Sequence, residues 1–171
     1  MTGRSLLTDA LLSRVGEVRV YQAPEELGNA ASRYFALAVG DENPLYTDNE
    51  YARSYGYGGV IAPPTLVCET NQYSNLQQSD DGYAGHSWNL EVPETVALRG
   101  GNEYEFIVPV NPSDVLTVTW KIVDMQEQKT RSGEQMLVVT SEANYVNQHG
   151  VLLVRNREAL IFKALGTHSD D

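Results

Sequence analysis

The residues best suited to acid–base chemistry stand in one short run, Gly40-Asp41-Glu42-Asn43-Pro44-Leu45-Tyr46. The carboxylate of Asp41 could take a proton from water, and Asn43 and Pro44 would form the turn that positions it. Tyr46 is a weak base at neutral pH, because a phenol titrates near pH 10. On residue type alone, Asp41 is better explained as a turn residue that bonds its own backbone.

Histidine is the side chain that normally titrates near neutral pH, and the chain has three. We expect His149 in a hairpin turn and His168 in the terminal segment, so His86 alone is placed to reach a pocket as a catalytic group. Cys68 is the single cysteine, which excludes an internal disulfide and a cysteine zinc site. No residue set has metal-ligand spacing, and no phosphate-binding glycine loop is present, so we expect no metal and no cofactor.

A second candidate site is the predicted helix start at Ala62-Pro63-Pro64-Thr65. A helix N-terminus offers free N–H groups, and the amides of Thr65 and Leu66 could face a substrate carbonyl. The two prolines lack an N–H, so a plain proline-started core helix is an equally good interpretation. Glu69 follows on the same helix, either as a pocket acid with a raised pKa or as an ordinary solvated residue.

Gly100 and Gly101 precede a predicted strand. Glycines at such a position let the backbone approach another chain or a ligand closely, and a plain turn explains them as well.

These groups must be positioned by helices that come first and strands that follow. Helical spacing predicts helices over 24–39, 48–54 and 64–76. Alternation and β-branched residues predict strands at 15–21, 103–110, 115–125, 135–146 and 151–162, with a possible short strand at 87–90. Residues 1–14 are expected to form a loosely held leader. This order indicates an α+β domain whose sheet leaves surface for a second copy or a partner to cover.

Composition narrows the class of protein further. A length of 171 residues suits a single domain, 1–171, with a core over about 15–163 and a tail over 164–171. The net charge of −11 argues against nucleic-acid binding. No apolar run is long enough to cross a bilayer, and no signal peptide is evident, so we expect a cytoplasmic protein without a membrane partner.

The run from Tyr34 to Tyr46 resembles the hydratase motif of the MaoC-like family, which ends in Gly-Asp-x-Asn-Pro-aliphatic-His. Tyr46 stands where the family has histidine. Three further blocks resemble the family, and the last two are similar to its N-terminal, fatty-acid-synthase-type dehydratase domains; the blocks span residues 57–65, 99–106 and 109–114.

The resemblance implies a hotdog fold, an antiparallel sheet wrapped around a central helix, paired as a double hotdog. It implies acyl-CoA or acyl-carrier-protein thioesters as substrates and no metal or redox cofactor. In the family a paired Asp and His hold the water, and the central helix start supplies N–H donors. Asp41 and Asn43 carry over to this pattern. Tyr46 does not replace the base, although it could orient a water or a carbonyl. The neighbourhood of Gly100 and Gly101 would contact pantetheine or the second subunit.

Several functions stay open at this point. The chain could be the half of an (R)-specific enoyl-thioester hydratase or 3-hydroxyacyl-thioester dehydratase that lacks the catalytic histidine and pairs with a catalytic MaoC-like partner. It could instead be a non-catalytic module that binds acyl thioesters or stabilises a partner. It could also be a homodimeric dehydratase of a biosynthetic pathway that uses Asp41 and His86.

Overall fold

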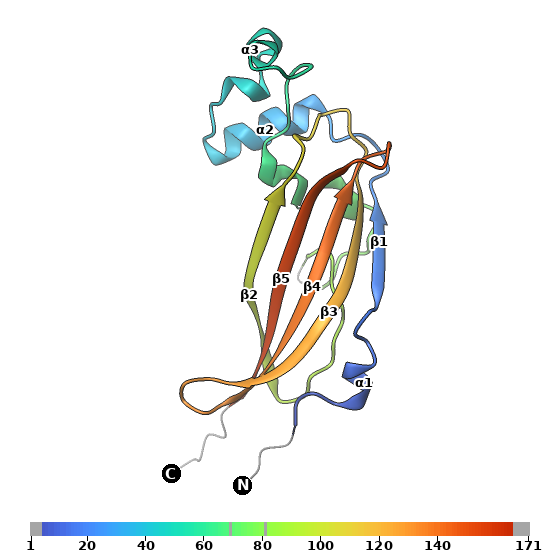
Figure 1. Cartoon of the computed structure of the whole chain (residues 1–171), viewed down its shortest axis with the longest axis vertical. Coiled ribbons are helices and arrows are strands. Elements are labelled where there is room, and N and C mark those ends of the chain that lie inside the picture. Colours follow the sequence, from blue (N-terminus) through green and yellow to red (C-terminus); the bar gives the residue numbers. More distant parts are fainter. Residues whose placement is uncertain (1–4, 69, 81, 166–171) are drawn as a thin grey trace.

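The computed structural model describes residues 5–68, 70–80 and 82–165. Its main element is a five-stranded antiparallel sheet in the order β1-β3-β4-β5-β2 (Figure 1). The strands are β1 (Val18–Gln22), β2 (Thr95–Phe106), β3 (Thr117–Lys129), β4 (Gln135–Val146) and β5 (Leu152–Ala164). The predicted α+β class and the antiparallel sheet of the hotdog fold are therefore confirmed, whereas pairing as a double hotdog stays a prediction.

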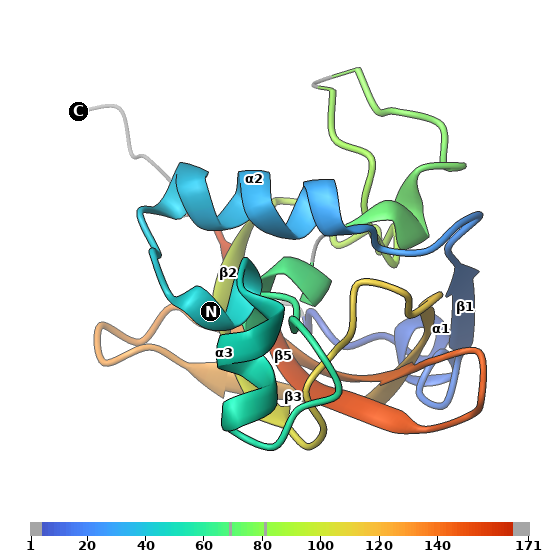
Figure 2. The ribbon, with the colours of Figure 1, turned by 90° about the horizontal axis from the view of Figure 1, so that it is seen from above.

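The helices lie mainly at one end of the strands (Figures 1 and 2). These are α2 (Asn29–Val39), α3 (Asn49–Ser54) and the 3-10 helix η1 (Pro44–Tyr46), whereas α1 (Asp9–Leu12) lies near the opposite end. No helix among the described residues is long and apolar enough to cross a membrane.

Helix α2 begins five residues after the predicted start at Pro24. The amides of Leu27 and Gly28 donate to the carbonyls of Asp114 and Pro112, so they bond the 111–114 turn instead of forming a first helical turn. The helix ends as predicted at Gly40, which has φ 71°. This left-handed conformation suits glycine because a side chain would be strained there.

The predicted helix over 64–76 is wrong as a single element. Within the described residues this segment forms two 3-10 helices, η2 (Pro64–Cys68) and η3 (Asn71–Tyr73). Gln72 is buried and donates to the carbonyls of Val67 and Cys68, so a side chain bonds carbonyls that a continuous helix would bond with backbone amides.

The core lies on one face of the sheet. Alternate residues of β3 and β4 are buried, as the sequence alternation predicts, among them Val118, Ile122, Leu137, Val139 and Tyr145. The leader is better held than predicted: Leu11 joins this core, and Glu127 of β3 accepts hydrogen bonds from Ser5 and from the amides of Leu6 and Leu7.

The edge strand β2 differs most from its prediction. It starts at Thr95 and ends at Phe106, because its partner β5 is 13 residues long and pairs with it from Thr95 onward. Ten of its twelve residues are exposed. The long strand therefore presents an uncovered edge in this chain.

Candidate functional site

The hydratase-like turn brings Asp41, Asn43 and Tyr46 together directly after α2. An oxygen of the Asp41 carboxylate accepts from the Asn43 amide at 3.1 Å, and the Asn43 side-chain oxygen accepts from the Leu45 amide at 3.1 Å. Both are turn bonds of the kind that Asp and Asn commonly make. Asp41 is exposed, so its carboxylate shapes the turn and also remains open to solvent.

Tyr46 is buried beside this turn, packed in a small cluster with Ala36 and Ile61. Burial raises the pKa of its phenol, and the nearby charge and hydrogen bond of the Asp41 carboxylate raise it further, while a bond from Asn43 opposes the shift. The phenol therefore stays protonated near neutral pH. It cannot take a proton from water near neutral pH.

The predicted amide donors at the start of η2 are partly occupied. The Ala62 amide donates to the carbonyl of Val110 at 2.7 Å, and the Leu66 amide donates to the carbonyl of Pro63 at 3.0 Å. The Leu66 amide is thus not free to face a substrate carbonyl, which corrects that interpretation. Thr65 is exposed on the first turn of η2 and remains a candidate. Glu69 lies outside the described residues.

Gly100 and Gly101 lie at an irregularity in β2, where the register with β5 shifts between Arg99 and Gly101. A Cβ on Gly100 would come within 3.0 Å of the Ala159 carbonyl oxygen, and Gly101 has φ 148°. The β-bulge explains why both positions are glycine. A contact with pantetheine or a second subunit at these glycines stays a prediction.

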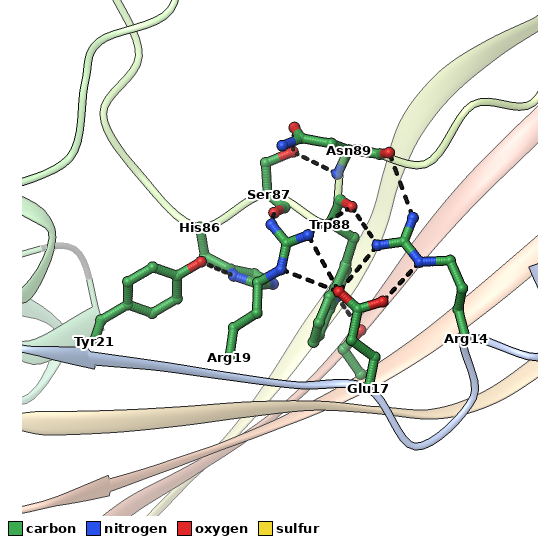
Figure 3. Close-up of polar contacts among 9 residues, drawn as sticks. Arg14, Glu17, Arg19, Tyr21, His86, Ser87, Trp88 and Asn89 are labelled. Carbon is green, nitrogen blue, oxygen red and sulfur yellow. Dashed lines mark hydrogen bonds and ion pairs between the residues drawn. The ribbon is translucent and has the colours of Figure 1, made fainter.

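His86 lies elsewhere, against the buried face of the sheet. Its ring stacks on Trp120 with centroids 4.3 Å apart and stands perpendicular to Trp88 at 4.5 Å. Tyr21 contacts it through a 3.0 Å bond between the phenol oxygen and Nδ1 (Figure 3). Burial lowers the pKa of His86 to about 3, the charge of Arg19 adds to this, and Glu17 partly opposes it.

A pKa near 3 keeps the imidazole neutral, so His86 is a poor general acid or base at neutral pH. The structure also separates it from the turn. Trp88 and Trp120, which hold His86, belong to the main core, whereas Tyr46 belongs to the small cluster at the end of the sheet. Among the described residues, no bond joins His86 to Asp41, so the surroundings do not favour the paired acid–base role.

A cavity of about 310 Å³ adjoins His86 on the buried face of the sheet. Its wall is mostly aromatic and aliphatic, with side chains from Trp88, Tyr104, Trp120, Leu160 and Phe162 among others. Trp88 is 2% exposed and belongs both to the core and to the wall of this cavity. The cavity lies at the lower end of the range typical of small-molecule sites and suits an apolar group.

One wall of this cavity is an extended segment that sequence reasoning mostly missed. Residues 86–90 form no strand, although we expect one at 87–90. Their carbonyls bond to arginine side chains: Arg14 donates to Trp88 and Asn89, and Arg19 donates to Ser87 and Trp88 (Figure 3). No local pattern could have revealed these partners, since the arginines are about seventy positions away.

Glu17 completes this arrangement by bridging the two arginines, at 2.6 Å from Arg14 and 3.2 Å from Arg19. The hydrogen bond from Arg14 is the main reason that the pKa of Glu17 is lowered, and Arg19 contributes, against a smaller opposing effect of burial. The carboxylate therefore stays charged and holds both guanidinium groups. In the parts of the chain that the structure describes, no cluster of three or more metal-ligating side chains occurs.

Comparison with known proteins identifies a family and relatives of similar sequence. Residues 14–156 match the family model of the FAS1-like dehydratase domain region. A UPF0336 protein of Streptomyces coelicolor is 35% identical over 132 residues, which cover 77% of this chain and 82% of the relative.

Two solved structures share the fold. The ChsH1–ChsH2 complex of Mycobacterium tuberculosis contains a chain that superposes with a TM-score of 0.71 at 15% identity, over 91% of both chains. The (R)-hydratase of A. caviae involved in PHA biosynthesis superposes with a TM-score of 0.59 at 20% identity, over 85% of this chain and 94% of that chain. The chain belongs to the FAS1-like dehydratase family.

Proposed function

We propose that the chain is the non-catalytic half of an (R)-specific enoyl-thioester hydratase or 3-hydroxyacyl-thioester dehydratase. The observation that carries this proposal is the buried, protonated Tyr46 in the position of the family's histidine, with Asp41 engaged in its own turn. Hydration needs a base that takes a proton from water as the oxygen bonds to Cβ, and a proton that is delivered to Cα. Tyr46 supplies neither group, and Asp41 stands without the imidazole that the family pairs with it.

The second half is a MaoC-like hotdog subunit with an intact Asp and His. The exposed edge of β2 is the surface for pairing with it, because Val96, Leu98 and Phe106 are each more than 40% exposed there. A long uncovered strand edge with apolar side chains is normally covered by another chain. The ChsH1–ChsH2 structure is itself a complex of two different chains, which supports this arrangement. The substrate would be an acyl-CoA or an acyl-carrier-protein thioester.

The test is hydration of crotonyl-CoA by the purified chain, alone and after co-expression with a hotdog protein that carries the Asp and His. We expect activity only with the partner, and the Asp41→Ala substitution should leave kcat of the pair within about twofold, which corresponds to less than about 0.5 kcal/mol in the barrier. Glu42→Ala, which removes the adjacent exposed carboxylate, is the matched control.

Activity of the chain alone that disappears with Asp41→Ala would overturn the proposal in favour of a homodimeric enzyme. Acyl-CoA binding without activity in any combination would instead indicate a binding module.

A further inference from the structure

Residues 86–90, the cavity strap, are held from the sheet below and by two arginines, Arg14 and Arg19, at its β1 side. Trp88 points inward from the strap and donates from its indole nitrogen to the Ser141 hydroxyl on β4 at 2.8 Å. Its neighbours Ser87 and Asn89 are exposed. The position of Trp88 therefore decides how much of the cavity beneath it is open.

Arg14 and Arg19 fix the strap from the solvent side. The two guanidinium groups make four hydrogen bonds to the carbonyls of Ser87, Trp88 and Asn89. Arg19 also lies over the Trp88 ring, with its guanidinium carbon 5.4 Å from the ring centroid. Guanidinium forks are suited to this task, since one group can bond two oxygens and stack on an aromatic face at once.

The strap is also under conformational constraint. Asn89 has φ 50° and Glu94, where the chain turns toward β2, has φ 59°. Asparagine reaches this region more readily than other non-glycine residues, whereas glutamate rarely does. At Asn89 the conformation is held by bonds on both sides, because Arg14 donates to its carbonyl and the Ser87 hydroxyl accepts from its amide at 3.2 Å.

We propose that the cavity strap is the specificity-determining wall of an apolar acyl site and that Arg14 and Arg19 are its positioning residues. The inference rests on the proposed function in one respect, namely that the ligand is the acyl part of a thioester. The cavity of about 310 Å³ has a mostly apolar, aromatic wall, in which Arg99 and Glu158 are the charged side chains. Its apolar part takes the uncharged end of the acyl chain, while the large polar carrier stays outside. Trp88, held by the arginines, limits how long or broad that end can be.

The experiment uses the full chain with butyryl-CoA and dodecanoyl-CoA as probes. Trp88 and Trp120 are the only tryptophans of the sequence and both line the cavity, so intrinsic fluorescence reports directly on its occupancy. Arg14 and Arg19 are replaced by Met, singly and together. Arg33→Met is the matched control, because Arg33 stacks on exposed Tyr34 of α2 at 5.5 Å without contacting the strap.

We expect the double variant to change the ratio of the two dissociation constants by about tenfold, a 1.4 kcal/mol difference between the probes. The control should keep the ratio of the unaltered chain. Arg14→Lys/Arg19→Lys should recover only part of the effect, since an ammonium lacks the planar fork. The thermal midpoint of each variant is measured in parallel to show that it is folded. Ser141→Ala removes the hydroxyl that accepts from Trp88, so it should change the ratio of the dissociation constants independently of the arginines.

Equal weakening of both probes, or no change in a folded double variant, would overturn this inference. Binding is measured without turnover, so the two proposals can fail separately. A changed ratio without hydration by any pair would count against the proposed function alone. Hydration by the pair with an unchanged ratio would count against the strap alone.

Discussion

Acidification below pH 6.5 should destabilise the fold through His86. In the folded chain burial lowers the pKa of this histidine from an ordinary 6.5 to about 3, whereas the unfolded chain takes up the proton near 6.5. The unfolded state then binds more protons, so the stabilisation is full above pH 6.5 and is lost as the pH falls toward 3. Each pH unit is worth 1.36 kcal/mol. At pH 5 the loss is therefore about 2 kcal/mol at most, and about 1 kcal/mol if solvent screens the accessible part of the ring.

The assay is urea unfolding at pH 7, 6 and 5, with the free energy of unfolding extrapolated to water. His86→Gln removes the titrating ring. Between pH 7 and pH 5, the free energy of unfolding of this variant should therefore fall by about 1–2 kcal/mol less than that of the unaltered chain. His149→Gln is the matched control, because His149 lies in the exposed β4–β5 turn. Parallel pH profiles for the unaltered chain and His86→Gln would refute the reasoning, whatever the absolute stability of the variant.

Three further changes test other parts of the structure. Gly40→Ala should lower the free energy of unfolding by about 1–2 kcal/mol, because φ is 71° at this position, although no atom would contact the added Cβ. Gly58→Ala is the control and should be neutral, because Gly58 also has open space around it but no positive φ. Trp88→Phe should cost about 1–3 kcal/mol by leaving the buried Ser141 hydroxyl unpaired, and Ser141→Ala in the same chain should recover part of that loss in a double-mutant cycle. Leu98→Lys on β2 should abolish co-elution with the catalytic partner in gel filtration. Val18→Lys on β1, the opposite edge strand, should leave co-elution unchanged. Equal effects of the two substitutions would exclude β2 as the pairing edge.

Much of the fold follows from local sequence patterns. The alternation of β4 predicts its bounds to the residue, Gly40 marks the end of α2, and Asp48 caps α3 by accepting from the amides of Glu50 and Tyr51. These features depend on neighbours within a few positions, so a single sequence contains what is needed to identify them. The motif around Asp41 likewise predicts a turn whose bonds are all local.

Other features depended on side-chain hydrogen bonds that periodicity and residue type do not predict, some of them between residues far apart in the sequence. The helix expected over 64–76 becomes two short 3-10 helices because Gln72 bonds the carbonyls of Val67 and Cys68, and periodicity does not reveal that a side chain will do so. The strand expected at 87–90 becomes a strap because arginine side chains bond its carbonyls.

The sequence by itself determined the family, the strands β3, β4 and β5, and the absence of histidine at position 46. Only the tertiary structure decided that His86 is a neutral, aromatic-packed ring away from Asp41, and that Arg14 and Arg19 hold the wall of a cavity. The physical reason is that the charge state of a side chain depends on burial and on nearby charges, which the fold brings together from distant parts of the chain.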